Sequence, residues 1–154
     1  MRWSKLRQVT EAWFAPEVRG RVALHMTAYR TTFHITRRDR AWITIDGREV
    51  VNMPYWGSYE RDRNVHGRYD SWDLYGSMRA LLTCTIDEAL AGKFPGRDLG
   101  TIGFGGVLRA LALLDARVGR RRLATLDPAA ELPLAAELLR FRLAARTRPA
   151  ANGG

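Results

Sequence analysis

Arginine residues cluster near residue 120, and their chemistry points to the binding of anions. Arg117, Arg120, Arg121 and Arg122 lie close together in the chain. Guanidinium groups bind phosphate through charge-assisted, often bidentate hydrogen bonds, so these four are candidate ligand-binding residues. The alternative is a solvated helix end, where cations favour the C-terminal dipole. Three consecutive arginines also point in different directions around a helix, so they cannot all face one ligand.

The charge of the whole chain favours an acidic partner. The sequence of 154 residues holds 25 Lys and Arg against 16 Asp and Glu, which gives a formal net charge of +9. Residues 115–148 contain eight cations and four anions, so nearly half of that charge falls on about a fifth of the chain. Such a balance predicts nucleic acid or an acidic protein as the partner.

An aromatic segment, residues 55–75, is the second candidate site. It holds six Tyr and Trp residues among charged ones, and its formal charge is −1. Aromatic rings among arginines can stack unpaired bases, and Tyr and Trp are also enriched in protein interfaces. Trp56 and Tyr59 are therefore candidate ligand-binding residues, and a protein-interaction or immunity-type module is the alternative function. The rings could instead cover the outer face of a sheet against Trp42.

The histidines form no recognisable catalytic or metal-binding pattern. His25, His34 and His66 lack the spacings that are typical of metal ligands. An enzymatic site assembled from His25, Tyr29 and His66 is the less favoured alternative. We therefore expect a non-enzymatic protein with no catalytic residues, no cofactor and no metal.

The single cysteine, Cys84, limits both the chemistry and the compartment. One cysteine allows neither an internal disulfide nor a multi-cysteine zinc site. Cys84 lies among leucines and is expected to be buried. These features, with no apolar run near 18 residues and no signal-peptide pattern at the start, predict a cytoplasmic protein that does not span a membrane.

Three strands are expected before most of the helices. Residues 40–45 and 48–53 are rich in β-formers and flank Asp46-Gly47, which supplies the positive φ angles of a type I′ hairpin turn. Alternation of apolar residues predicts a further strand over 21–31. The two-residue turn predicts that Ile43 faces Val50 across the hairpin.

Helix signals surround this sheet. Ser4 and Ser71 are suitable N-cap residues, Thr85 and Glu88 match a capping box, and Asp127-Pro128 is typical of a cap followed by the first helical residue. The Gly-rich segment 93–106 is expected to be an irregular connector, since no strand and no Lys-Ser or Lys-Thr mark it as a phosphate-binding loop. The expected helices cover 4–15, 72 onward, 85–92, 107–118 and 134–145.

Strands grouped before helices predict an α+β fold: an N-terminal helix, a three-stranded antiparallel sheet, and a C-terminal helical cluster. The length of the chain fits one domain, here expected over residues 1–146, with a disordered tail over 147–154.

Four motifs give the chain a family resemblance: WSKL at 3–6, WITIDG at 42–47, TIDEAL at 85–90 and LDARVGRRRL at 114–123. Together they resemble a family of small uncharacterised bacterial cytoplasmic proteins, along most of residues 3–123, with an apparent insertion at 93–106. The resemblance implies a bacterial source and no assigned activity, and it nominates no site residue.

Overall fold

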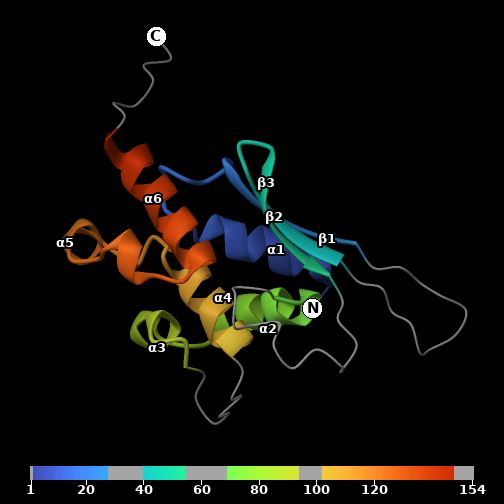
Figure 1. Ribbon diagram of the computed structural model, residues 1–154. Coiled ribbons are helices and arrows are strands. Elements are labelled where there is room, and N and C mark those ends of the chain that lie inside the picture. The colour runs from blue at the N-terminus through green and yellow to red at the C-terminus, as the bar shows by residue number, and fades with distance from the viewer. Residues whose placement is uncertain (1, 28–39, 55–68, 94–101, 148–154) are drawn as a thin grey trace, which may run out of the picture.

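The α+β class is confirmed by the computed structural model, which describes residues 2–27, 40–54, 69–93 and 102–147 (Figure 1). An N-terminal helix precedes a three-stranded sheet, and helices follow. The expected tail lies outside the described residues from 148 onward. The elements are α1 Trp3–Ala12, β1 Val22–Thr27, β2 Arg40–Ile45, β3 Arg48–Pro54, α2 Ser71–Leu81, α3 Ile86–Leu90, α4 Ile102–Ala112, α5 Arg120–Ala124, the 3-10 helix η1 Pro128–Ala130 and α6 Pro133–Thr147.

The sheet is antiparallel with strand order β1-β2-β3. The expected tight turn is confirmed, because Asp46 and Gly47 have φ angles of 49° and 81°. The strand expected over 21–31 is present as β1, and residues 28–31 lie outside the described part.

The predicted pairing of Ile43 with Val50 is wrong. A β-bulge between Ile43 and Thr44 shifts the register, so that Ile43 pairs with Val51. The extra residue places Met53 opposite Ala41 on the buried face, whereas an unbroken ladder would have placed Asn52 there. The bulge thus exchanges a polar side chain for an apolar one in the core.

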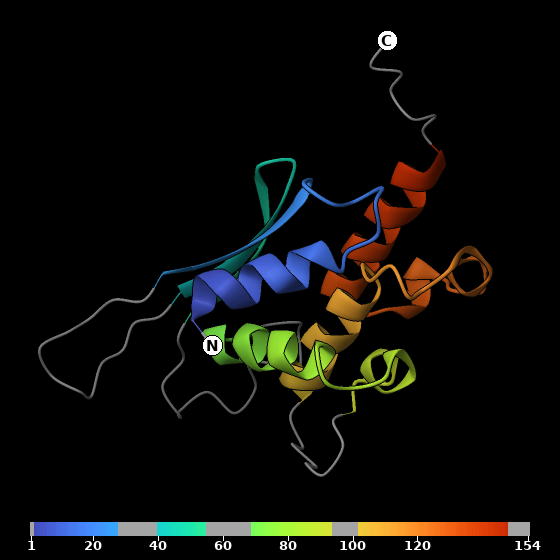
Figure 2. The same ribbon diagram turned by 180° about the vertical axis from the view of Figure 1, so that it is seen from behind.

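The helices gather on one face of the sheet, as the two opposite views show (Figures 1 and 2). Leu24, Ile43 and Met53 are fully buried on this face, and α1, α2 and α6 pack against the strands. At the free edge of β1, the Glu11 carboxylate accepts a hydrogen bond of 2.8 Å from the Leu24 N–H. This contact satisfies an edge donor that could otherwise pair with another chain.

Two of the predicted N-cap residues are wrong, because helices α1 and α2 both begin earlier in the chain than predicted. Helix α1 begins at Trp3 after Arg2, so Ser4 lies inside the helix. Helix α2 is capped by Asp70 and not by Ser71, in a reciprocal capping box with Asp73. The Asp70 carboxylate accepts the Asp73 N–H and the Asp73 carboxylate accepts the Asp70 N–H, both at 2.9 Å, so the cap lies one residue before the predicted Ser71.

The other cap predictions are confirmed. Thr85 and Glu88 form the predicted capping box of α3. Asp127 accepts the Ala129 N–H in front of Pro128.

The Gly-rich segment was expected to be irregular up to residue 106, but α4 already begins at Ile102. A Cβ on Gly105 would lie 2.8 Å from the Gly92 carbonyl oxygen, and one on Gly106 would lie 3.3 Å from the Tyr69 ring. These glycines therefore allow close packing of a helix. They do not mark a flexible connector. Helix α4 also ends at Ala112, six residues before Val118, where the predicted stripe ended.

Candidate functional site

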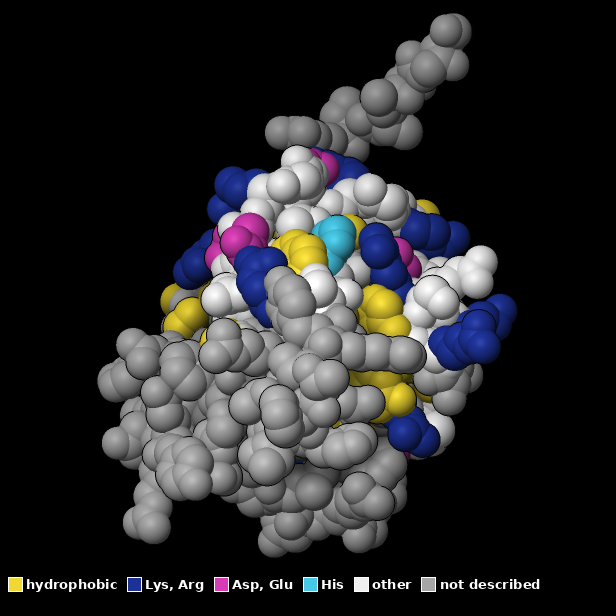
Figure 3. Space-filling view, turned by 90° about the vertical axis from the view of Figure 1, so that its right-hand side faces the viewer, with side chains coloured by type: hydrophobic (Ala, Val, Ile, Leu, Met, Phe, Trp, Pro, Cys, Tyr) yellow, Lys and Arg dark blue, Asp and Glu magenta, His cyan; other side chains and the backbone are white. Residues whose placement is uncertain are grey.

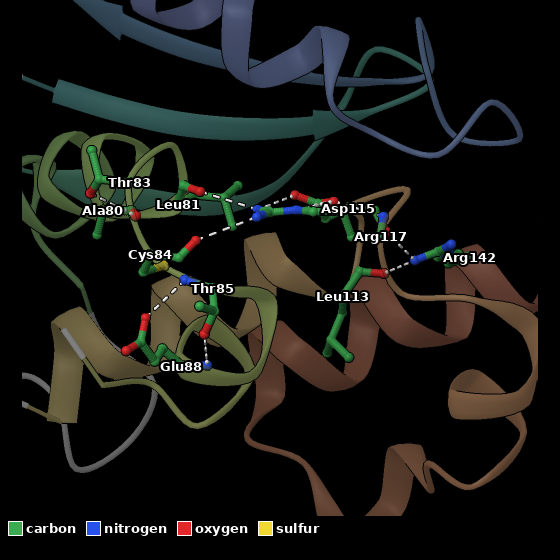
Figure 4. Close-up of polar contacts among 10 residues, drawn as sticks. All are labelled: Ala80, Leu81, Thr83, Cys84, Thr85, Glu88, Leu113, Asp115, Arg117 and Arg142. Carbon is green, nitrogen blue, oxygen red and sulfur yellow. Dashed lines mark hydrogen bonds and ion pairs between the residues drawn. The ribbon is translucent and has the colours of Figure 1, made fainter. Parts of the chain in front are cut away.

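The guanidinium group of Arg117, the first candidate residue, is engaged by neighbouring segments of the fold although its side chain is 36% exposed (Figure 4). Its guanidinium group donates bidentate hydrogen bonds of 3.0 and 2.9 Å to the Asp115 carboxylate. It also donates to the carbonyl oxygens of Leu81 and Cys84, at 3.1 and 3.4 Å, and it lies 4.7 Å above the centroid of the Trp13 ring. This side chain joins three separate segments, so it is not available to a ligand in the way that a free surface arginine is.

Arg142 completes the same structural unit from α6. Only 3% of the residue is exposed. Its guanidinium group donates to the carbonyl oxygens of Leu113, Asp115 and Val118 at 2.8, 2.9 and 2.7 Å, and it pairs with Glu17 at 3.2 Å. We call Asp115, Arg117 and Arg142 the Asp115 junction, because they fix the chain where it leaves α4.

The backbone reinforces the Asp115 junction. The Ala15 N–H donates to the Leu114 carbonyl at 2.7 Å, and the Ala116 N–H donates to the Trp13 carbonyl at 2.9 Å. The first half of the LDARVGRRRL motif thus serves to anchor the N-terminal helix to the C-terminal helices. Arg142 was not singled out as a site residue, and its distance in sequence from the motif left no signal for the contact.

The remaining three arginines of the cluster lie on α5. Gly119 is the N-cap of this short helix, and Leu123 anchors it in the core with 1% exposure. Arg120, Arg121 and Arg122, here called the α5 arginines, are all exposed. Neither Arg120 nor Arg121 has a hydrogen-bond or ion-pair partner among the residues that the structure describes.

Arg122 differs from its two neighbours because it forms an ion pair with Asp87 of α3. Two other described carboxylates, those of Glu88 in α3 and Asp127 before η1, accept capping hydrogen bonds. Glu88 accepts the Thr85 N–H at 2.8 Å, and Asp127 accepts the Ala129 N–H at 3.0 Å. The α5 arginines therefore retain two unpaired cations beside carboxylates that cap helices.

Trp56 and Tyr59, the candidates from the aromatic segment, lie outside the described residues. The described rings of that segment divide into buried and exposed ones. Tyr69 is buried, and burial together with Asp73 raises the pKa of its hydroxyl. Trp72 is 48% exposed, and its ring meets that of Tyr75 edge-on at a centroid distance of 6.0 Å.

The outer face of the sheet carries a stacked ring pair and a cation–π contact, neither of which was predicted from the sequence. The His25 ring stacks on Trp42 at 4.9 Å, and its Nε2 lies 2.9 Å from the Thr44 hydroxyl. The Arg40 guanidinium group lies 4.3 Å from the centroid of the Trp42 ring. Figure 3 shows histidine, hydrophobic and Lys or Arg side chains adjoining on this side of the molecule. The stack depends on the pairing of His25 with Trp42, which no local signal fixes.

Burial lowers the pKa of His25. The Arg7 charge lowers it further, and that of Arg40 adds a smaller effect, while Glu11 opposes both. His25 is therefore neutral near pH 7, since its ordinary pKa is about 6.5. Tyr29 and His66, the partners in the alternative enzymatic site, lie outside the described residues.

Cys84 is buried, as expected from its neighbours. Burial raises the pKa of its thiol, and the Arg117 charge offsets this effect only in part. Across residues 2–27, 40–54, 69–93 and 102–147, no group of three or more His, Cys, Asp and Glu side chains is placed to hold a metal ion.

Among the described helices, none combines the length and the apolarity needed to cross a membrane.

Comparison with known proteins bears on helix α1 and the three strands of the sheet. Residues 2–66 match the model of the SF0329 protein family. The chain resembles the SF0329 protein family over α1 and the sheet. The WSKL and WITIDG motifs fall within the match, whereas the Asp115 junction and the α5 arginines follow it. Searches of curated proteins and of solved structures returned no match.

Proposed function

We propose that this protein is a non-enzymatic binding protein that engages nucleic acid through the α5 arginines, in a bacterial cytoplasm. One observation supports the proposal above the others. Arg120 and Arg121 are exposed on a helix anchored by Leu123, and neither has an acidic partner among the described residues. The net charge of +9 adds a long-range attraction for a polyanion.

The chemistry of the α5 arginines favours phosphate over bases. The described ring contacts of arginines involve Arg21, Arg40, Arg79 and Arg117, and none involves an α5 arginine. A guanidinium group without an aromatic neighbour offers charge and hydrogen bonds, which position phosphates and carry no base sequence. We therefore expect binding that is weakly dependent on sequence and strongly dependent on salt.

The salt dependence of binding tests directly whether the α5 arginines contact phosphates. Each phosphate contact contributes about −0.9 to the slope of log K against log salt concentration for duplex DNA. Two unpaired arginines predict a slope of about −2, measured by fluorescence anisotropy with a labelled duplex.

Two charge-reversal variants distinguish binding at a defined site from attraction by the net charge of the protein. The double variant Arg120→Glu with Arg121→Glu should abolish binding or weaken it by at least about tenfold. The matched control is Arg2→Glu with Lys5→Glu, which changes the net charge equally at exposed positions on and beside α1. Equal weakening by both variants would show attraction by net charge alone and would contradict a site on α5.

A protein-interaction surface is the second candidate, favoured by the exposure of Trp72 beside Tyr75. Large exposed aromatic rings are enriched at protein interfaces. Trp72→Ala, Trp56→Ala and Tyr59→Ala should then remove a nuclease-resistant partner in affinity purification without lowering the thermal midpoint. A partner that is lost on nuclease treatment would instead support nucleic-acid binding.

A further inference from the structure

Asp87 and Arg122 form an ion pair that links α3 to α5 at one end of the molecule (Figures 1 and 2). The Asp87 side chain is 76% exposed and the Arg122 side chain 45% exposed. Asp87 lies in the first turn of α3, but the capping hydrogen bond from the Thr85 N–H is accepted by Glu88. The pair thus joins two surface elements without burying either charge.

An exposed ion pair of this kind is weak, because water and salt screen the attraction and two side chains lose rotamer freedom. A phosphate oxygen makes the same hydrogen bonds to a guanidinium group as a carboxylate does. A polyanion and Asp87 therefore compete for Arg122, while Arg120 and Arg121 remain unpaired.

We propose that Asp87 tunes the polyanion site by withholding Arg122 from the ligand. The inference rests on the proposed function of the α5 arginines. It makes Asp87 a positioning residue that sets how many cations contact phosphate: two while the pair is closed, and three once it opens.

Removing the Asp87 charge should tighten binding. Asp87→Asn should lower the dissociation constant for a DNA duplex about two- to fivefold at low salt, and the slope of log K against log salt should steepen by about 0.9. The matched control is Glu137→Gln, which breaks the ion pair of Glu137 with Arg48 and changes net charge equally. The control should leave both the affinity and the slope within error of the wild type.

Repeating the Asp87→Asn substitution in an Arg122→Ala variant tests whether Arg122 is the residue released from the ion pair. Asp87→Asn should leave the slope of log K against log salt unchanged when it is combined with Arg122→Ala, whereas it steepens the slope in the wild-type background. Equal tightening by Asp87→Asn and Glu137→Gln would overturn the inference in favour of net charge.

The two proposals fail differently. If Arg120→Glu with Arg121→Glu leaves binding unchanged, the proposed site on α5 is wrong. If that variant weakens binding while Asp87→Asn matches the wild type, the site stands and the role of Asp87 is overturned. Thermal midpoints measured for every variant keep a folding defect from imitating either result.

Discussion

Asp115 and Arg117 are two residues apart in the chain, and both carboxylate oxygens accept hydrogen bonds from the one guanidinium group. The Arg117 N–H also donates to the same carboxylate at 2.8 Å. Asp115 is 1% exposed, so its carboxylate is shielded from water and these donors supply its hydrogen bonds. The pair converts part of an arginine-rich motif into a structural element.

Arg117→Met should destabilise the fold by about 2 kcal/mol. Loss of one partner from a wholly buried ion pair costs about 3–5 kcal/mol, and the partly exposed guanidinium group of Arg117 reduces that value. The free energy of unfolding in urea measures the change. Arg120→Met serves as the surface control and should stay within about 0.5 kcal/mol of the wild type. Equal stability of the two variants would contradict a structural role for Arg117.

Arg142→Met should have a larger effect than Arg117→Met. The substitution keeps the apolar stem but leaves the carbonyl oxygens of Leu113, Asp115 and Val118 without this donor. Buried unsatisfied acceptors cost about 1–3 kcal/mol each, so we expect a loss of at least about 3 kcal/mol. Urea unfolding of Arg140→Met, an exposed position on the same helix, provides the matched comparison. A loss no greater than that of Arg140→Met would argue against the junction.

Gly105→Ala tests whether close packing explains the glycines of α4. In an open helix this change would stabilise by about 1 kcal/mol. Here the new Cβ would lie 2.8 Å from the Gly92 carbonyl oxygen, so overpacking should destabilise the protein by about 1–3 kcal/mol. The sign of the change in a thermal or urea unfolding experiment decides the matter, and a gain in stability would contradict the close approach.

His25 should make stability depend on pH below about 6.5, its ordinary pKa. Because its pKa is lowered in the folded state, the folded protein binds fewer protons than the unfolded chain in this range. The contribution of His25 is therefore fully present above about pH 6.5 and is lost as the pH falls through the folded-state value.

The comparison of wild type with His25→Gln isolates this effect from other titrating groups. The stability advantage of the wild type should shrink between about pH 7.5 and pH 5. The His25 ring resonances should titrate below about pH 6.5 in NMR spectra. Titration above that value would show that Glu11 outweighs burial and the two arginine charges.

The local elements of this fold followed from neighbouring residues. Asp46-Gly47 fixed the hairpin turn, Thr85 with Glu88 fixed the start of α3, and Asp127-Pro128 fixed the start of η1. In each case the donor, the acceptor or the positive φ angle lies within three residues, so short-range chemistry suffices. The α+β class followed in the same way from the order of these segments.

Only the tertiary structure decided the features that depend on distant contacts. The bulge near Thr44 is set by the need to bury Met53 in place of Asn52, and the early start of α4 is set by packing of Gly105 against Gly92. Neither the sheet register nor a helix contact of this kind is encoded within one segment.

The candidate site shows the same division most clearly. Composition and spacing identified the arginine cluster, but Arg117 and Arg120 are the same residue type in one motif, and sequence offers no way to tell them apart. Their roles differ because the carbonyl oxygens of Leu81 and Cys84 lie within reach of Arg117, whereas Arg120 projects from α5 without a described partner. Long-range placement of backbone acceptors therefore determines which guanidinium groups stabilise the fold and which remain open to a ligand.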